Sequence, residues 1–327
     1  MLRRFVHTAF LLLAMQSCCV STPAVAQGFP QRPITVVVTF PPGGSADIVA
    51  RALEPKVSAQ LGQPLVIENR PGAGGNIGIG SVVKAEPDGY TVGIAAAGVL
   101  AVNPHLNRNM PFDPKKDLAP ITLLAQIPFV LAAGPRTAVA SVADVLAMAR
   151  TAPDAVSIGH GGNGTAMHLT AALFSQRAGI SVPLVPYRGT APATNDVLGG
   201  HIALAVLDIP ASLQLIREGK LRALGVSSKN RFPQLADVPT LAEAGLPGYE
   251  SVGWFGLVAP RSTPPDIIAR LNAAFSLALR DPQVIEKISV LGAEPAPSSH
   301  EAFAAYIESE GEKWGKLVNA VGLKADN

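Results

Sequence analysis

The chain has 327 residues, with 26 Lys and Arg against 24 Asp and Glu, and only two cysteines. Hydrophobic residues make up 48% of it and charged residues 15%, which is ample for a folded core and argues against disorder. The near-neutral charge, without a long run of like charges, argues against a nucleic-acid partner. The length fits two ordinary domains or one large one.

The first 26 residues have the pattern of a secretory signal peptide. Arg3 and Arg4 give a positive start, an apolar stretch covers residues 5–15, and small residues at Ala24 and Ala26 form a cleavage site. The apolar stretch is shorter than the ~20 residues that a transmembrane helix needs. We therefore predict cleavage after Ala26 and export to the periplasm.

Cleavage changes the composition of the mature chain. Cys18 and Cys19 both lie in residues 1–26, so the mature chain has no cysteine for a disulfide, a reactive thiol or a metal site. Residues 1–26 also hold two of the 26 basic residues and no acidic residue, which leaves 24 of each sign. The mature protein therefore has a formal net charge of zero.

Strand and helix patterns alternate along the mature chain, which is typical of the α/β class with parallel sheets. Strands are predicted at residues 34–40, 65–68, 91–95, 157–159, 184–187, 202–207 and 222–226. Helices are predicted at residues 45–60, 143–150, 165–178, 191–198, 212–218, 264–279, 282–291 and 299–321.

Two apolar, extended segments differ from their neighbours because neither contains a glycine-rich loop. They cover residues 121–133 and 251–259. If each crosses between two α/β lobes, the chain has a discontinuous first lobe (residues 27–128 and 253–327) and an inserted second lobe (residues 129–252). We then expect a ligand cleft between the lobes.

Two glycine-rich turns lead from a predicted strand into a predicted helix. The first contains Phe40, Gly43, Gly44, Ser45 and Ala46, and the second contains Gly161, Asn163, Gly164, Thr165 and Ala166. The N–H groups at a helix start are unpaired and the helix dipole is positive there, so such turns attract anions. One turn in each lobe could hold one anion from both sides. Each turn could equally be a capped strand–helix connection without a ligand. His168, one helical turn after Thr165, could orient Thr165 or pack between helix and sheet.

Other motifs exclude several activities. The third glycine-rich turn, residues 70–78, lacks the glycine spacing of a dinucleotide site, and no Gly-Lys-Ser/Thr follows for a phosphate loop. No Gly-x-Ser-x-Gly elbow is present, and no histidine pair has metalloprotease spacing. We therefore expect no catalytic residues, no metal and no cofactor. Asp208 ends an apolar strand, where α/β sheets place ligand sites, and is a candidate contact to an amine or hydroxyl.

Motifs spread over nearly the whole mature chain resemble the Bug-type receptors of tripartite tricarboxylate transporters. The matching stretches are FPPGGSAD (40–47) with AR (50–51), ENRPGAGGN (68–76), PDGYT (87–91), PFDP (111–114), GNGT (162–165), VPYRGTAP (185–192), GKLRAL (219–224), VPTL (238–241) and WFGLVAP (254–260). The resemblance implies a two-lobed periplasmic binding protein, type II-like, that closes on a small carboxylate.

The resemblance also implies which residues contact the ligand. The two glycine-rich turns meet its carboxylate, and Ala96 and Ala97 line the cleft. Tyr187, Arg188 and Asp208 lie where the far end of the ligand is recognised. Arg188 could pair with a second carboxylate or remain a solvated loop residue, whereas Asp208 would favour an amino acid or a hydroxy acid. These two indications conflict.

The sequence therefore predicts a periplasmic receptor, not an enzyme, for a small organic carboxylate: a dicarboxylate, an amino acid or an aromatic acid. We expect it to act as a monomer and to deliver the ligand to the membrane permease of a tripartite tricarboxylate-type transporter. The alternative is an orphan receptor that signals to a sensor kinase, with the same binding lobes.

Overall fold

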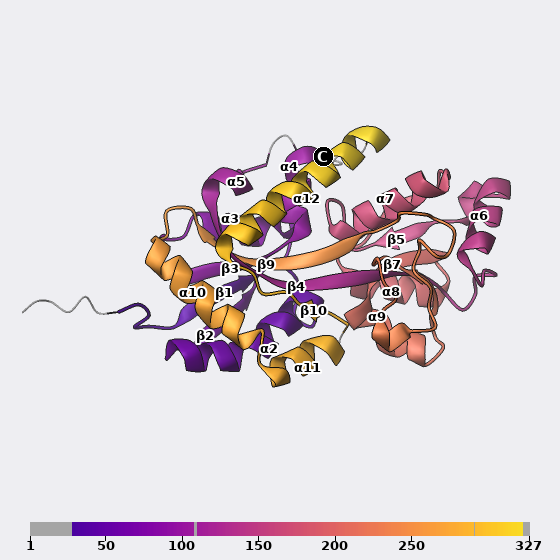
Figure 1. Cartoon of the computed structure of the whole chain (residues 1–327). Coiled ribbons are helices and arrows are strands. Elements are labelled where there is room, and N and C mark those ends of the chain that lie inside the picture. The colour runs from indigo at the N-terminus through magenta and orange to yellow at the C-terminus, as the bar shows by residue number, and fades with distance from the viewer. Residues whose placement is uncertain (1–27, 108–109, 291, 323–327) are drawn as a thin grey trace, which may run out of the picture.

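The computed structural model describes residues 28–107, 110–290 and 292–322, and two long strands join two groups of elements in it (Figure 1). The predicted signal peptide lies outside these residues. The first group, the first lobe, begins with β1 (Ile34–Val38), α2 (Ser45–Leu61), β2 (Leu65–Asn69), η1 (Ala73–Gly75), α3 (Asn76–Val83), β3 (Thr91–Ala96), η2 (Gly98–Val102), α4 (Asn103–Leu106) and α5 (Pro114–Asp117). It is completed by α10 (Pro265–Ala278), α11 (Pro282–Val290), β10 (Glu294–Pro295) and α12 (His300–Val321).

The second group, the second lobe, follows the long strand β4 (Leu118–Ala133). It consists of α6 (Val142–Thr151), η3 (Pro153–Ala155), β5 (Ile158–His160), α7 (Ala166–Ala178), β6 (Leu184–Pro186), α8 (Thr190–Gly199), β7 (Leu204–Asp208), α9 (Ile209–Arg217), β8 (Arg222–Val226) and η4 (Pro233–Leu235). The strand β9 (Val252–Pro260) returns the chain to the first lobe. The predicted α/β class with two lobes is therefore confirmed.

The strand β4 belongs to both sheets. Its residues from Leu118 to Pro128 pair with β9, and its residues from Phe129 to Ala133 pair with β7. The pairing partner thus changes close to the predicted lobe boundary at 128/129, which itself stays a prediction, as does the boundary at 252/253. The segment carries no charged side chain, as expected for a strand that is buried along most of its length.

The expectation of parallel sheets is correct for only part of the structure. β1 pairs in parallel with β2 and β3, and β5 with β6 and β7. β9 runs antiparallel to β3 and β4, and β4 runs antiparallel to β7 and β8, so the expectation is wrong there. β4 and β9 are antiparallel to each other because β4 leaves the first lobe and β9 returns to it.

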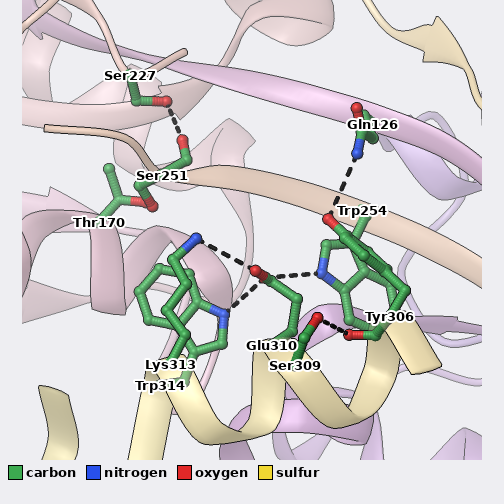
Figure 2. Close-up of polar contacts among 10 residues, drawn as sticks. All are labelled: Gln126, Thr170, Ser227, Ser251, Trp254, Tyr306, Ser309, Glu310, Lys313 and Trp314. Carbon is green, nitrogen blue, oxygen red and sulfur yellow. Dashed lines mark hydrogen bonds and ion pairs between the residues drawn. The ribbon is translucent and has the colours of Figure 1, made fainter. Parts of the chain in front are cut away.

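A buried polar cluster lies beside β4 and β9 where the two strands run together between the lobes, as Figure 2 shows. The Glu310 carboxylate on α12 accepts hydrogen bonds from the indole N–H groups of Trp254 (3.1 Å) and Trp314 (2.9 Å). Nearby, Gln126 of β4 donates to the Tyr306 hydroxyl of α12. Trp254 and Trp314 are each only 1% exposed. The helix α12 is thus tied to both crossing strands.

We predict that Glu310→Ala destabilises the protein, because two buried indole N–H groups lose their acceptor. Each unsatisfied donor should cost roughly 1–3 kcal/mol of the free energy of unfolding, measured by urea denaturation. Glu312→Ala, an exposed change on the same helix, is the matched control and should stay within about 0.5 kcal/mol of the unchanged protein. Equal losses in both variants would contradict the structural role of Glu310.

Candidate functional site

A cavity of 310 Å³ lies where the two lobes meet. It is lined by Phe40, Pro41, Pro42, Gly43, Gly44, Ser45, Ala46, Gly74, Ala96, Ala97, Gly98, Ile127, Phe129, Thr165, Ala166, Met167, Arg188, Gly189, Thr190, Ala191, Pro192, Asp208, Ala211, Gly253, Trp254 and Phe255. The structure thus brings eleven of the predicted site residues to one cavity: Phe40, Gly43, Gly44, Ser45, Ala46, Ala96, Ala97, Thr165, Ala166, Arg188 and Asp208.

The first residues of four helices line this cavity. They belong to α2 and, from the second lobe, to α7, α8 and α9. No side chain caps the start of α2, α8 or α9. Because the N–H groups of a first turn have no partner within the helix, these starts contribute positive potential to the cavity from the backbone.

Asp47 braces the first glycine-rich turn. Its carboxylate accepts hydrogen bonds from the Gly43 N–H (3.0 Å), the Arg51 guanidinium (2.9 Å) and the Asn69 amide (3.0 Å). Asn69 also donates to the Phe40 carbonyl. Burial acts to raise the pKa of Asp47, but these hydrogen bonds outweigh it and hold the pKa below the ordinary value. The ionised Asp47 carboxylate therefore fixes the turn, and Asp47 itself does not line the cavity.

Two stacked histidines support the second glycine-rich turn. The rings of His160 and His168 lie 4.4 Å apart, and their Nδ1 atoms accept hydrogen bonds from the N–H groups of Gly162 and Gly164, each at 3.3 Å. Thr165 donates to the Gly162 carbonyl and accepts from the His168 N–H, so its hydroxyl caps α7. Both roles proposed for His168, packing and orienting Thr165, fit this arrangement.

The two lobes also meet through a side-chain hydrogen bond. The Ser45 hydroxyl donates to Oδ2 of Asp208, which ends β7. Asp208 is 8% exposed, and its Oδ1 has no hydrogen-bond partner among the described residues. Burial raises the pKa of Asp208, while the neighbouring Ser45 and Thr190 hydroxyls act in the opposite direction.

A second, larger cavity of 720 Å³ adjoins the first and shares with it Phe40, Pro41, Gly74, Arg188 and Gly189. The remaining predicted site residues line this larger cavity: Gly161, Asn163, Gly164 and Tyr187. The Tyr187 hydroxyl donates to Asp196 at 2.7 Å, and burial together with this carboxylate raises the pKa of Tyr187 to about 12. The structure therefore divides the predicted set between two connected spaces.

Sequence reasoning missed several walls of the smaller cavity. Phe129, Met167, Trp254 and Phe255 give it a largely apolar surface. Three of them lie in the two segments that were predicted to cross between the lobes. A strand that crosses a cleft must pass along its floor, so this position was the signal that could have found them.

Comparisons with known proteins identify the family. A family model described as "Tripartite tricarboxylate transporter family receptor" matches residues 49–323. The protein BugT of Bordetella pertussis (strain Tohama I) is 36% identical over 306 residues, which cover 93% of this chain and 94% of BugT. The chain belongs to this receptor family. The resemblance of its motifs to Bug-type receptors is thereby confirmed.

Solved structures agree with this assignment. The structure of Rpa4515 of R. palustris with adipate is 36% identical, with a TM-score of 0.87 over 91% of this chain and 99% of that one. MatC from Rhodopseudomonas palustris with bound malate is 33% identical, with a TM-score of 0.83 over 89% and 100% of the two chains. The chain is accordingly a periplasmic solute receptor, and receptors of this family are not enzymes.

Neither a membrane-crossing helix nor a metal cluster is present among the described residues. Within them, no helix combines the length and apolar character that a membrane crossing needs. In the same ranges, no group of three or more His, Cys, Asp or Glu gathers in a way that could hold a metal ion.

We predict that His160 makes stability depend on pH. Burial, reinforced by His168, lowers the pKa of His160 from 6.5 to about 3. Between these values the unfolded chain binds a proton that the folded protein excludes, so stability should fall by up to ~1.4 kcal/mol per unit as pH decreases. Urea denaturation at several pH values should show that the free energy of unfolding depends less steeply on pH in His160→Asn. His201→Asn, an exposed control, should keep the pH dependence of the unchanged protein. An unchanged pH dependence in His160→Asn would contradict the prediction.

The lobes approach each other closely at glycines. A methyl group on Gly98 of the first lobe would lie only 2.5 Å from the Gly164 carbonyl oxygen of the second lobe. A methyl group on Gly164, where φ is +74°, would collide with the Asn103 side chain. The third glycine-rich turn takes part as well, because Gly74 faces the Asn163 carbonyl oxygen. This turn therefore contributes to lobe contact.

We predict that Gly98→Ala holds the lobes apart, because its methyl group would occupy the space of the Gly164 carbonyl. Overpacking of this kind costs about 1–3 kcal/mol, so a more open average shape should relieve it. Small-angle X-ray scattering should show a larger radius of gyration. Gly80→Ala is the control, since its methyl group would make only ordinary contact with Phe112 at 3.7 Å. An unchanged radius in both variants would show that closure does not depend on Gly98.

Proposed function

We propose that this receptor binds a small organic carboxylate in the 310 Å³ cavity and delivers it to the membrane permease of a tripartite tricarboxylate-type transporter. The observation that carries the proposal is the convergence of the α2 and α7 starts on one cavity, through Ser45 and Ala46 from one lobe and Ala166 and Met167 from the other. Two relatives whose structures are described with adipate and with malate support the same ligand class.

The chemistry of the cavity fits a carboxylate whose charge is met by backbone N–H groups. Such hydrogen bonds are charge-assisted and strengthen when closure excludes water. The apolar side chains around them would contact the body of the ligand. Micromolar affinity requires only about −8 kcal/mol, which several charge-assisted hydrogen bonds and lobe closure can supply.

We place the protein in the periplasm after cleavage following Ala26, which the intact mass of the exported protein tests. A sensor kinase remains the alternative partner. Cross-linking in whole cells, with the ligand present, would distinguish a captured permease subunit from a captured kinase.

We predict that Ser45→Ala and Thr165→Ala each weaken binding by roughly 1–3 kcal/mol, or about 5- to 150-fold in Kd. Ser45→Ala removes the hydroxyl that joins the lobes at Asp208, and Thr165→Ala removes the cap of α7. The measurement is calorimetric titration with the acid that gives the largest thermal shift among mono-, di- and tricarboxylates, amino acids and aromatic acids. In the thermal-shift comparison, a ligand at 100 times its Kd adds about 2.7 kcal/mol to the free energy of unfolding, which is enough to detect.

The matched control is Thr151→Ala, an exposed hydroxyl at the end of α6. It should leave affinity unchanged. Normal affinity in both cavity variants, with intact folding, would count against the proposed clamp. No thermal shift with any acid would count against the ligand class.

A further inference from the structure

Asp208 is the one acidic side chain that lines the smaller cavity within the described part of the chain. It is more than nine-tenths buried, at 8% exposed. Its Oδ2 is occupied by the Ser45 hydroxyl, and its Oδ1 has no partner among the described residues. The same cavity lies at the starts of α2 and α7, where the proposed function puts an anion.

The side chains around Asp208 offer little compensating charge. Its β-sheet neighbour is Phe129 on β4, a strand without charged residues. On α2, Asp47 is already paired with Arg51, and on α8, Asp196 accepts from Tyr187. The only charged residue of α9 is Arg217, in its last turn.

Two other titratable groups lie nearby. Arg188 lines the cavity but is exposed, and in the described structure it forms no salt bridge. His160 stacks on His168 behind the second turn and accepts the Gly162 N–H, so its Nδ1 carries no proton. No buried cation is therefore present among the described residues to neutralise an ionised Asp208 beside a bound anion.

We propose that the cavity captures its anion together with one proton, held by Asp208, and therefore selects carboxylates that lack an ammonium group. The proposal rests on the proposed carboxylate site. Two carboxylates in one small, largely apolar cavity cannot both be ionised at low cost, so the bound anion and a neutral Asp208 belong together. The raised pKa that burial gives Asp208 acts in the same direction.

The neutral form also removes an uncompensated charge from the unpartnered oxygen. A protonated Oδ1 becomes an O–H donor, and Oδ2 still accepts from Ser45. An ammonium group would instead require an ionised Asp208, and the proton would be released. Acids without an amine and amino acids thus differ in the sign of their proton linkage.

For a carboxylate ligand without an amine, the direction in which affinity changes with pH follows directly. Below the pKa of Asp208 in the free protein, affinity should not depend on pH. Above it, binding must first protonate Asp208, so Kd should rise by up to tenfold per pH unit and proton uptake should approach one per ligand.

The experiment is isothermal titration calorimetry of the mature protein with adipate, benzoate and L-aspartate. Each titration is run in two buffers of different ionisation enthalpy, between about pH 6.5 and 9, where the carboxyl groups of the three probes are ionised. We expect uptake of a proton with adipate or benzoate and a rising Kd at high pH. Asp208→Asn should abolish both effects and bind more tightly than the unchanged protein at high pH. Asp237→Asn, an exposed change, is the control and should keep both effects.

Several results would overturn the inference. Binding of adipate or benzoate without buffer dependence at any pH would remove the proton linkage and leave the carboxylate receptor intact. Buffer dependence that persists in Asp208→Asn would assign the proton to another group. Tighter binding of L-aspartate, without proton uptake, would show that Asp208 pairs with an amine. Binding of none of the three probes would overturn both this inference and the proposed function.

Discussion

The indole of Trp254 connects the cavity to the region that joins the lobes. Trp254 lines the cavity and donates to Glu310, which also accepts from Trp314 on the same helix. Because Trp254 lies on the returning strand β9, the floor of the cavity is fixed to α12 by a buried, charge-assisted hydrogen bond. The floor of the cavity and α12 are thus held together where both strands pass between the lobes.

The backbone itself contributes positive potential to the cavity, because the first N–H groups of a helix have no partner within the helix. Helix starts keep their positions only if their turns are rigid, and each turn has its own support. Asp47 fixes the first turn and the histidine pair fixes the second. Neither support needs to touch the ligand. The apolar walls lower the local dielectric constant, which makes each N–H contact more effective than it would be in water.

The pattern of the sequence predicted most of this architecture. Alternating elements indicated the α/β class, and the glycine-rich turns at 40–47 and 161–166 lie at helix starts in the structure. The helix α3 was missed because its glycines at Gly78 and Gly80 resemble a loop; Gly78 lies where a methyl group would collide with the Arg70 carbonyl oxygen. The split between two cavities was also missed. Only the packed structure shows that the Tyr187 hydroxyl is taken by Asp196.

Closure and recognition are joined at the loop that begins α7. In the proposed complex, an anion between the starts of α2 and α7 keeps Gly164 against Gly98 and Asn103. The proposed hydrogen bonds to the ligand and the steric fit of the lobes would then contribute to one free energy. A side chain at Gly98 would occupy the space of the Gly164 carbonyl oxygen, so the proposed closure requires glycine there. The small residues of the turns thus determine how closely the lobes approach each other as well as the shape of the site.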